Sequence, residues 1–298
     1  MGLTADHWRG HAAMLMFSAL VAGSFSLGAI VANDIAPPAI TALRFVLAAV
    51  VMGVFAVFGP GIRRQHFQAP WRYLVLGGLL AFYFVLMFEA LKTAKPISAA
   101  AVFTLMPLMA AGFGWLLLRQ ITTPRMALAL AIAALGALWV IFRGDLGAAS
   151  TLDIGRGEVI YFIGCISHAL YSPVVRKLNR GESAVVFTFG TLVAGAILLL
   201  VFAMPDLLAT DWTALPGMVW VTLGYLVFFS TAASFVCLQY ASLRLPAAKV
   251  TAYSYLTPAW VILWEAGIGN GWPGMIVFLG VAATIVALAI LLKDEARS

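Results

Sequence analysis

Long apolar segments, each near the length of a membrane-spanning helix, dominate the sequence. An α-helix needs about 20 residues to cross a bilayer, and ten segments approach that length. Hydrophobic residues make up 63% of the chain and charged residues 10%, against about 45–50% and about 25% in an ordinary soluble domain. Because one core cannot bury so large an apolar excess, lipid must solvate it. We therefore expect an all-α integral membrane protein. The ten expected helices lie near residues 11–31, 38–58, 72–92, 96–118, 123–142, 157–176, 184–204, 215–240, 247–267 and 272–292.

A pattern of two prolines occurs twice along the chain. Pro96 and Pro246 each open an apolar segment, and Pro107 and Pro258 lie about three helical turns further on. The matching prolines are 150 and 151 positions apart. Such a period in a chain of 298 residues predicts two tandem halves.

The helix count sets the relation between these halves. Ten helices give five to each half, and an odd number makes the second half enter the membrane from the opposite side. We therefore expect two inverted repeats, residues 1–148 and residues 149–298. Paired halves with matching broken helices are typical of secondary transporters.

The positions of Lys and Arg predict the orientation in the membrane. With a cytoplasmic N-terminus, thirteen of the 18 Lys and Arg residues lie inside and four outside, while Arg44 falls within the second helix. Because positive residues accumulate in cytoplasmic loops, we expect a multi-pass protein of the cell inner membrane with both termini in the cytoplasm. Arg44, roughly 9 Å below the surface, is expected to snorkel toward the periplasm or to form a structural salt bridge.

Several function classes lack their sequence signatures. The chain has no G-x-x-x-x-G-K-[ST] loop for ATP, no H-E-x-x-H motif and no Cys/His cluster for a metal. It also lacks the aromatic-interleaved basic stretch that indicates nucleic-acid binding. Cys165 and Cys237 fall inside predicted helices, where they serve as small apolar residues. We expect no catalytic residues, no cofactor, no metal and no nucleic-acid partner, and transport that is secondary or facilitated.

Three motifs point to a known family. One runs from Pro37 to Arg44 in the second helix, and two related motifs end at the inner prolines Pro107 and Pro258. Together they resemble the drug/metabolite transporter superfamily, EamA type, and most of all the YddG exporters of aromatic and other amino acids. The resemblance implies a basket of ten helices around a central cavity, which is lined by the first, third, fourth, sixth, eighth and ninth helices. It also implies exchange between outward-open and inward-open shapes.

Polar residues recur on one face of the sixth helix. Tyr161, Cys165, His168 and Ser172 are spaced at i, i+4, i+7 and i+11. His168 lies ten residues after Glu158, about 15 Å along the helix and near the bilayer centre. A titratable group at that depth indicates a functional site. The alternative is a neutral histidine that forms a hydrogen bond to a neighbouring helix.

The third and eighth helices occupy matching places in the two halves. Tyr83 and Phe84 make the third helix aromatic, whereas Ser230 and Ser234 make the eighth rich in hydroxyls. An aromatic wall opposite a polar wall suits amphipathic solutes with a planar side chain. The expected substrate-binding residues are His168, Tyr83, Phe84, Ser24, Phe103, Tyr161, Ser172, Ser230, Ser234, Thr251 and Tyr255.

Three prolines within predicted helices are expected to act as hinges or kinks. Pro107 and Pro258 free the carbonyls of Phe103 and Ser254 from their usual helical bonds, and Pro173 loosens the last turn of the sixth helix. Freed carbonyls need protein partners or cavity water. A simple packing kink is the alternative for each proline.

Three hypotheses of function follow. The leading one is a carrier that exports amino acids, aromatic and other neutral, or related small metabolites by alternating access. The second is a nucleotide-sugar or sugar-phosphate antiporter that uses Lys249 to bind phosphate. The third is an integral membrane enzyme with His168 as base. The exact solute, the coupling ion and the choice between monomer and homodimer stay open.

Overall fold

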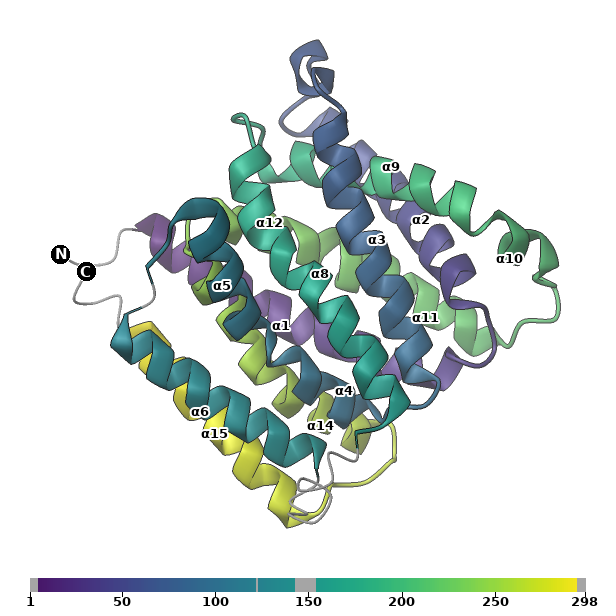
Figure 1. The fold of residues 1–298 in the computed structure, drawn as a ribbon. Coiled ribbons are helices and arrows are strands. Elements are labelled where there is room, and N and C mark those ends of the chain that lie inside the picture. Colours follow the sequence, from purple (N-terminus) through teal and green to yellow (C-terminus); the bar gives the residue numbers. More distant parts are fainter. Residues whose placement is uncertain (1–4, 122, 143–153, 294–298) are drawn as a thin grey trace.

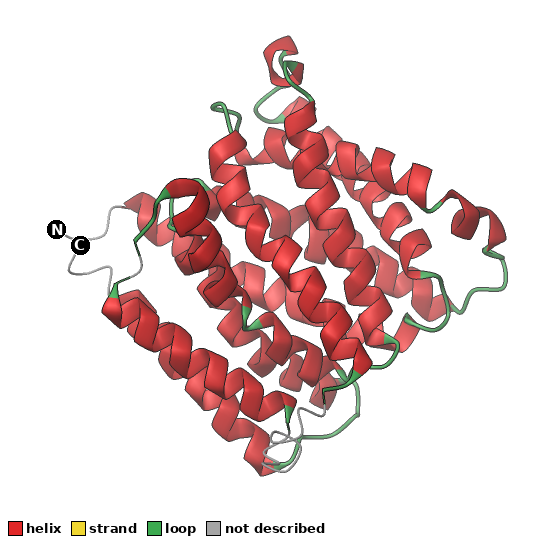
Figure 2. Ribbon diagram, in the orientation of Figure 1, coloured by secondary structure: helices red, strands yellow, loops and turns green. Residues whose placement is uncertain are grey.

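Helices supply all the regular structure of the protein that can be described. The computed structural model describes residues 5–121, 123–142 and 154–293, and these ranges contain no strand (Figure 2). The helices are α1 (Ala5–Val31), α2 (Pro37–Phe58), α3 (Trp71–Leu91), α4 (Pro96–Phe103), α5 (Met106–Leu118), α6 (Pro124–Ile141), α8 (Arg156–Leu178), α9 (Ala184–Phe202), α10 (Met204–Ala209), α11 (Gly217–Val227), α12 (Ser234–Ser242), α13 (Ala247–Ala252), α14 (Thr257–Gly267) and α15 (Met275–Lys293). Shorter pieces are the 3₁₀ turns η1 (Arg64–Phe67) and η3 (Tyr253–Leu256) and the π-helical turn η2 (Phe228–Ala233).

The predicted membrane spans recur in the structure. Within the described ranges, nine helical segments are long and apolar enough to cross a bilayer. They correspond to nine of the ten segments expected from the sequence. The ninth expected segment, residues 247–267, is also helical, but it is divided into α13, η3 and α14. The protein is therefore an all-α integral membrane protein, as its composition predicts.

The two halves pack against each other along their lengths. Helix α3 contacts α8 and α9, α1 contacts α12 and α14, and α6 lies beside α15 at one edge of the bundle (Figure 1). Helix α1 begins and α15 ends on the same side of the bundle (Figure 1). The expected boundary between the repeats, at residues 148 and 149, lies outside the described residues.

Glycines let pairs of helices approach closely. A Cβ atom on Gly77 in α3 would lie 2.4 Å from the backbone nitrogen of Gly195 in α9. A Cβ atom on Gly136 in α6 would lie 2.7 Å from the carbonyl oxygen of Gly280 in α15. Because lipid gives helices no hydrophobic reason to associate, such backbone contacts stabilise the bundle by close van der Waals packing.

The three expected hinge prolines differ in their surroundings. Helix α4 ends at Phe103 and α5 begins at Met106, which places Pro107 in the first turn of α5. Pro258 likewise lies in the first turn of α14. A proline is compatible with a first turn, where its missing N–H would have no helical partner. Pro173, in contrast, lies inside α8, which continues to Leu178.

The turn η2 interrupts the eighth membrane segment and was not expected from the sequence. It joins α11 to α12, and Ser234 Oγ donates to the carbonyl oxygen of Ser230 at 2.7 Å. Single π-helical turns are frequent at functional sites, because the extra residue leaves a carbonyl group without its usual partner. This turn is therefore a candidate element of the site.

Candidate functional site

A cluster of buried rings lies where α3, α4 and α8 meet. A hydrogen bond of 2.7 Å joins the hydroxyls of Tyr83 and Tyr161. The ring of His168 lies 4.5 Å from that of Tyr83 in an edge-to-face arrangement, and Phe103 stacks on Tyr161 at 6.4 Å. None of the four side chains is more than 3% exposed. The structure thus brings together four expected binding residues, two from each half.

The cluster continues through Phe84 toward α2 and α12. Phe84 lies 4.6 Å from Tyr83 and stacks on Phe235 at 5.7 Å, while Phe45 meets both Phe84 and Phe235 edge-on. Sequence reasoning missed Phe45 and Phe235. Phe235 lies in the eighth segment, which was expected to contribute hydroxyls, so aromatic rings at this site come from the eighth segment as well as from the third.

Arg44 lies beside this cluster with its guanidinium entirely buried. The guanidinium carbon lies 3.8 Å from the centre of the Phe84 ring. Its Nη2 donates to the carbonyl and hydroxyl oxygens of Ser230 at 2.9 and 3.3 Å, and its Nε donates to Thr231 Oγ1. Among the described residues its Nη1 has no hydrogen-bond partner.

The position of Arg44 corrects the expectation from the sequence. A snorkelling arginine would reach water, but Arg44 is 0% exposed. A structural salt bridge would require a carboxylate, but its hydrogen-bond partners in the described chain are the hydroxyl and carbonyl groups of η2. A buried ion without a counter-ion costs several kcal/mol. The ring of Phe84 and the polar atoms of η2 offset part of that cost.

Other buried polar atoms also lack partners in the described chain. Among them are Nδ1 of His168, in the ring cluster, and both amide atoms of Gln239, which lies one helical turn after Phe235 in α12 and is 0% exposed. A buried donor or acceptor without a partner costs about 1–3 kcal/mol. Together with Nη1 of Arg44, these atoms offer donors and acceptors to a polar solute that reaches the cluster.

The remaining expected residues fall into two groups. Ser230 and Ser234 lie in or next to η2, within the surroundings of Arg44. The others have hydrogen bonds elsewhere: Ser24 donates to Val21 O, Thr251 to Ala247 O, Ser172 bonds Ser242, and the carbonyl of Tyr255 accepts from Thr284.

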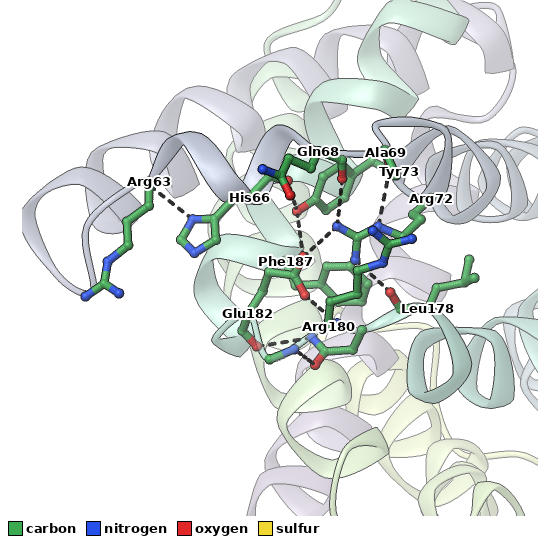
Figure 3. Close-up of polar contacts among 12 residues, drawn as sticks. Arg63, His66, Gln68, Ala69, Arg72, Tyr73, Leu178, Arg180, Glu182 and Phe187 are labelled. Atoms are coloured by element: carbon green, nitrogen blue, oxygen red, sulfur yellow. Dashed lines mark hydrogen bonds and ion pairs between the residues drawn. The ribbon is translucent and has the colours of Figure 1, made fainter.

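A second polar network lies at the end of the bundle where α3 begins and α8 ends (Figure 3). Arg72 Nη2 contacts Glu182 Oε1 at 2.7 Å, and Arg72 Nη1 donates to the carbonyl oxygen of Leu178 at 2.7 Å. Glu182 Oε2 accepts from the backbone N–H of Arg180 at 2.6 Å. Burial raises the pKa of the Glu182 carboxyl, but the hydrogen bonds from Arg72 and from the backbone outweigh it and hold the pKa below its ordinary value. The network ties α3 to the loop between α8 and α9.

Metal-ligating side chains and thiols are few in the described part of the chain. No three His, Cys, Asp or Glu side chains there could hold a metal ion together. Cys165 is buried, Cys237 is half-buried, and both are free thiols.

Comparison with known proteins identifies the fold and the family. The model of the EamA-like transporter family matches twice, at residues 8–142 and 155–293. The uncharacterized transporter YyaM of Bacillus subtilis (strain 168) is 27% identical over 280 residues, which are 93% of this chain and 91% of that protein. A protein crystal structure aligns over the whole of both chains with 22% identity and a TM-score of 0.73, a likeness of fold. Because the family matches span nearly the whole chain, the protein is a membrane transporter rather than an enzyme, and it belongs to the EamA-like transporter family.

Proposed function

We propose that the protein exports amino acids, aromatic and other neutral ones, across the cell inner membrane by alternating access. The observation that carries the proposal is the buried guanidinium of Arg44, which lies over Phe84 with Nη1 unpaired among the described residues. A solute carboxylate would form a charge-assisted hydrogen bond with this group. A planar side chain would stack against the adjoining rings.

The polar atoms around the cluster supply the rest of the recognition. An amino-acid ammonium group needs acceptors, and Oε1 of Gln239 and the hydroxyl of Tyr83 are acceptors of that kind. The neutral imidazole of His168 can both donate and accept a hydrogen bond. A zwitterion would therefore find partners for both charges without a permanent buried carboxylate. This solute class agrees with the resemblance to the YddG exporters.

The charge of the cluster favours amino acids over phosphate esters. A phosphate group is usually bound by several Lys or Arg side chains. Among the described residues that form the ring cluster and its surroundings, Arg44 alone carries a full positive charge. Lys249, expected for a phosphate-binding carrier, lies at the start of α13 and is buried. A single guanidinium suits one carboxylate.

The orientation forms part of the proposal. With residues 1–148 and 149–298 as inverted repeats, both termini lie in the cytoplasm, together with the loop that contains η1. Reporter tags at Ser298 and in that loop should read cytoplasmic, and tags between Asp206 and Asp211 periplasmic. A periplasmic C-terminus would contradict the inverted arrangement.

Uptake into proteoliposomes tests the substrate class. We expect transport of labelled phenylalanine, slower transport of phenylalaninamide, which lacks the carboxylate, and none of hexose phosphate. A charge-assisted hydrogen bond contributes about 1.5–3 kcal/mol. Arg44→Gln should therefore slow phenylalanine transport roughly 10- to 100-fold and change phenylalaninamide transport little.

Controls separate recognition from folding. Arg64→Gln removes an exposed arginine and should transport like the wild type. Equal losses for phenylalanine and its amide in Arg44→Gln would assign Arg44 to structure alone. Transport of hexose phosphate without any amino acid would contradict the proposed substrate.

A further inference from the structure

The broken helices of the two halves end in the same way. Helix α5 is followed by Arg119, with a left-handed φ of 54°, and then by Gln120. Helix α14 is followed after one residue by Gly269, with a φ of 90°, and then by Asn270. Each half therefore places a side-chain amide directly after a left-handed residue at the end of its broken helix.

The helix starts that lie next to these two helix ends also occupy matching positions in the two halves. Helix α13 begins with Ala247 after Pro246, and α4 begins with Pro96 followed by Ile97. The end of α5 lies against the start of α13, whereas α14 packs on α4. The proline period equates Ile97 with Ala247. The inverted repeat thus sets up two equivalent contacts, one at each end of the bundle.

One of these contacts is made. The backbone N–H of Ala247 donates to Oε1 of Gln120 at 3.2 Å. Gly114 in α5 gives the room for it, because a Cβ atom there would lie 2.7 Å from Oε1 of Gln120 and 3.5 Å from the Cβ of Ala247. This hydrogen bond uses one of the N–H groups that the first turn of a helix leaves without a helical partner. The hydrogen bond therefore joins the end of α5 to the start of α13.

The equivalent contact at the other end is not made. Asn270 Nδ2 donates to Oε2 of Glu265 at 2.9 Å, and its backbone N–H donates to the carbonyl oxygen of the same residue. A pocket of about 610 Å³ is lined by Pro96, Ile97, Glu265 and Asn270, among others. The pocket lies where the second amide contact would form.

We propose that Gln120 and Asn270 are reciprocal latches that close opposite ends of the transport path. Gln120 holds the cytoplasmic end shut in the shape described here. When the periplasmic end closes, Asn270 releases Glu265, its side-chain oxygen accepts from the N–H of Ile97, and the Gln120–Ala247 contact opens. The proposal rests on the alternating access of the proposed function, but it does not depend on which solute is carried.

A disulfide across the open end reports its closure. Ile97→Cys and Asn270→Cys are introduced together into the full chain, with Cys165→Ala and Cys237→Ala removing the free thiols. A disulfide requires Cα atoms within about 7 Å, so its rate of formation in proteoliposomes follows the population with the periplasmic end closed. Because this pair lacks the Asn270 amide, any effect of a change at Gln120 is transmitted from the opposite end.

Variants at Gln120 give the decisive comparison. A neutral hydrogen bond contributes about 1 kcal/mol, close to a fivefold change in an equilibrium, so Gln120→Ala should speed disulfide formation about fivefold. Gln120→Glu keeps an oxygen acceptor and should stay near the original rate. Gln65→Ala, which removes an exposed amide from a different loop on the same side, should also leave the rate unchanged.

Three results would contradict the proposal that Gln120 and Asn270 act as latches. The first is an equal rate in Gln120→Ala and Gln65→Ala. The second is fast disulfide formation with Gln120 intact, because the periplasmic end would then already be closed. The third is no disulfide in any background, because the ends would then never meet. Because the disulfide assay contains no solute, a failure to transport amino acids would contradict the proposed substrate but would not contradict the proposed latches.

Discussion

Removal of the Glu182 carboxylate should destabilise the protein strongly although the residue lies far from the ring cluster. The side chains of Arg72 and Glu182 are 1% and 3% exposed, so their ion pair is shielded from water. Glu182→Ala leaves the buried guanidinium of Arg72 without a counter-charge and the N–H of Arg180 without its carboxylate acceptor. Loss of one partner from a buried pair costs about 3–5 kcal/mol.

The hydrogen bonds of Glu182 predict smaller losses of stability for other substitutions than for Glu182→Ala. Both carboxylate oxygens of Glu182 accept, one from Arg72 and one from the Arg180 N–H. Glu182→Gln keeps one oxygen acceptor and should lose roughly half as much stability as Glu182→Ala. The pair Arg72→Met and Glu182→Leu removes both charges, so its loss should be smaller than the sum of the single losses. It should not reach zero, because Arg72 also donates to the carbonyls of Leu178 and Gln68.

The free energy of unfolding can be measured by SDS titration of the purified protein in detergent, followed by tryptophan fluorescence. Arg180→Ala, which changes an exposed side chain but keeps the backbone N–H, serves as the matched control. A change below about 0.5 kcal/mol in Glu182→Ala, the range of ordinary surface substitutions, would refute the reasoning. The pair would then behave as a solvated surface contact.

Glu182, His168 and Gly77 each give a further prediction. Because the pKa of Glu182 is lower in the folded protein than its ordinary value of 4.5, this carboxylate stabilises the fold fully above pH 4.5, and the stabilisation is lost as the pH falls through the lowered pKa. SDS titrations between pH 7 and pH 3 should show this loss of stability in the wild type and a smaller loss in Glu182→Gln. His168→Phe keeps the ring packing but removes Nδ1, so transport should fall several-fold while gel-filtration behaviour stays unchanged; wild-type transport would reduce the histidine to a packing role. Gly77→Ala places a methyl group against the backbone of Gly195 and should cost about 1–3 kcal/mol in SDS titration, whereas the neighbouring Gly78→Ala, with 3.5 Å to its nearest neighbour, should cost far less.

The lengths of the apolar segments alone predicted most of the helices. The second helix was expected at 38–58 and occupies Pro37–Phe58, because a proline at its start and Gly59 after its end mark the boundaries. The break at residues 253–256 has a weaker signal. Pro258 indicates an interruption, but the 3₁₀ turn before it depends on the neighbouring helices; the carbonyl of Tyr255, for example, accepts from Thr284 in α15.

The candidate site was predictable only in part. Helical spacing placed Tyr161 and His168 on one face, and both lie in the ring cluster. Small hydroxyls carry a weaker signal, because a serine or threonine in a helix can donate to a carbonyl of its own preceding turn. Ser24 and Thr251 do so. The spacing of such residues therefore does not show whether their hydroxyls also face a solute.

Arg44 shows a different limit of sequence reasoning. Its depth in the second helix is evident from the sequence, but its partners are Ser230 and Thr231, nearly 190 positions away. Those partners exist because η2 turns a carbonyl and two hydroxyls toward α2, and a π-helical turn has no reliable sequence pattern. A long-range contact between a buried charge and an irregular backbone therefore had to come from the structure.

The distribution of tight contacts indicates which helices move together. Helices α3 and α9 touch through Gly77 and Gly195, and the Arg72–Glu182 pair fixes the start of α3 to the loop that leads into α9. Packed backbones and a buried ion pair resist sliding, so we expect α3 and α9 to move as one unit. The broken pairs α4–α5 and α13–α14 lack a continuous ladder of hydrogen bonds, and each carries a proposed latch at its end. Under the alternating access that we propose, we therefore expect the motion to be confined to the broken helices, whose interruptions let the two parts of each pair tilt separately, while α3 and α9 keep Tyr83 and Phe84 in place.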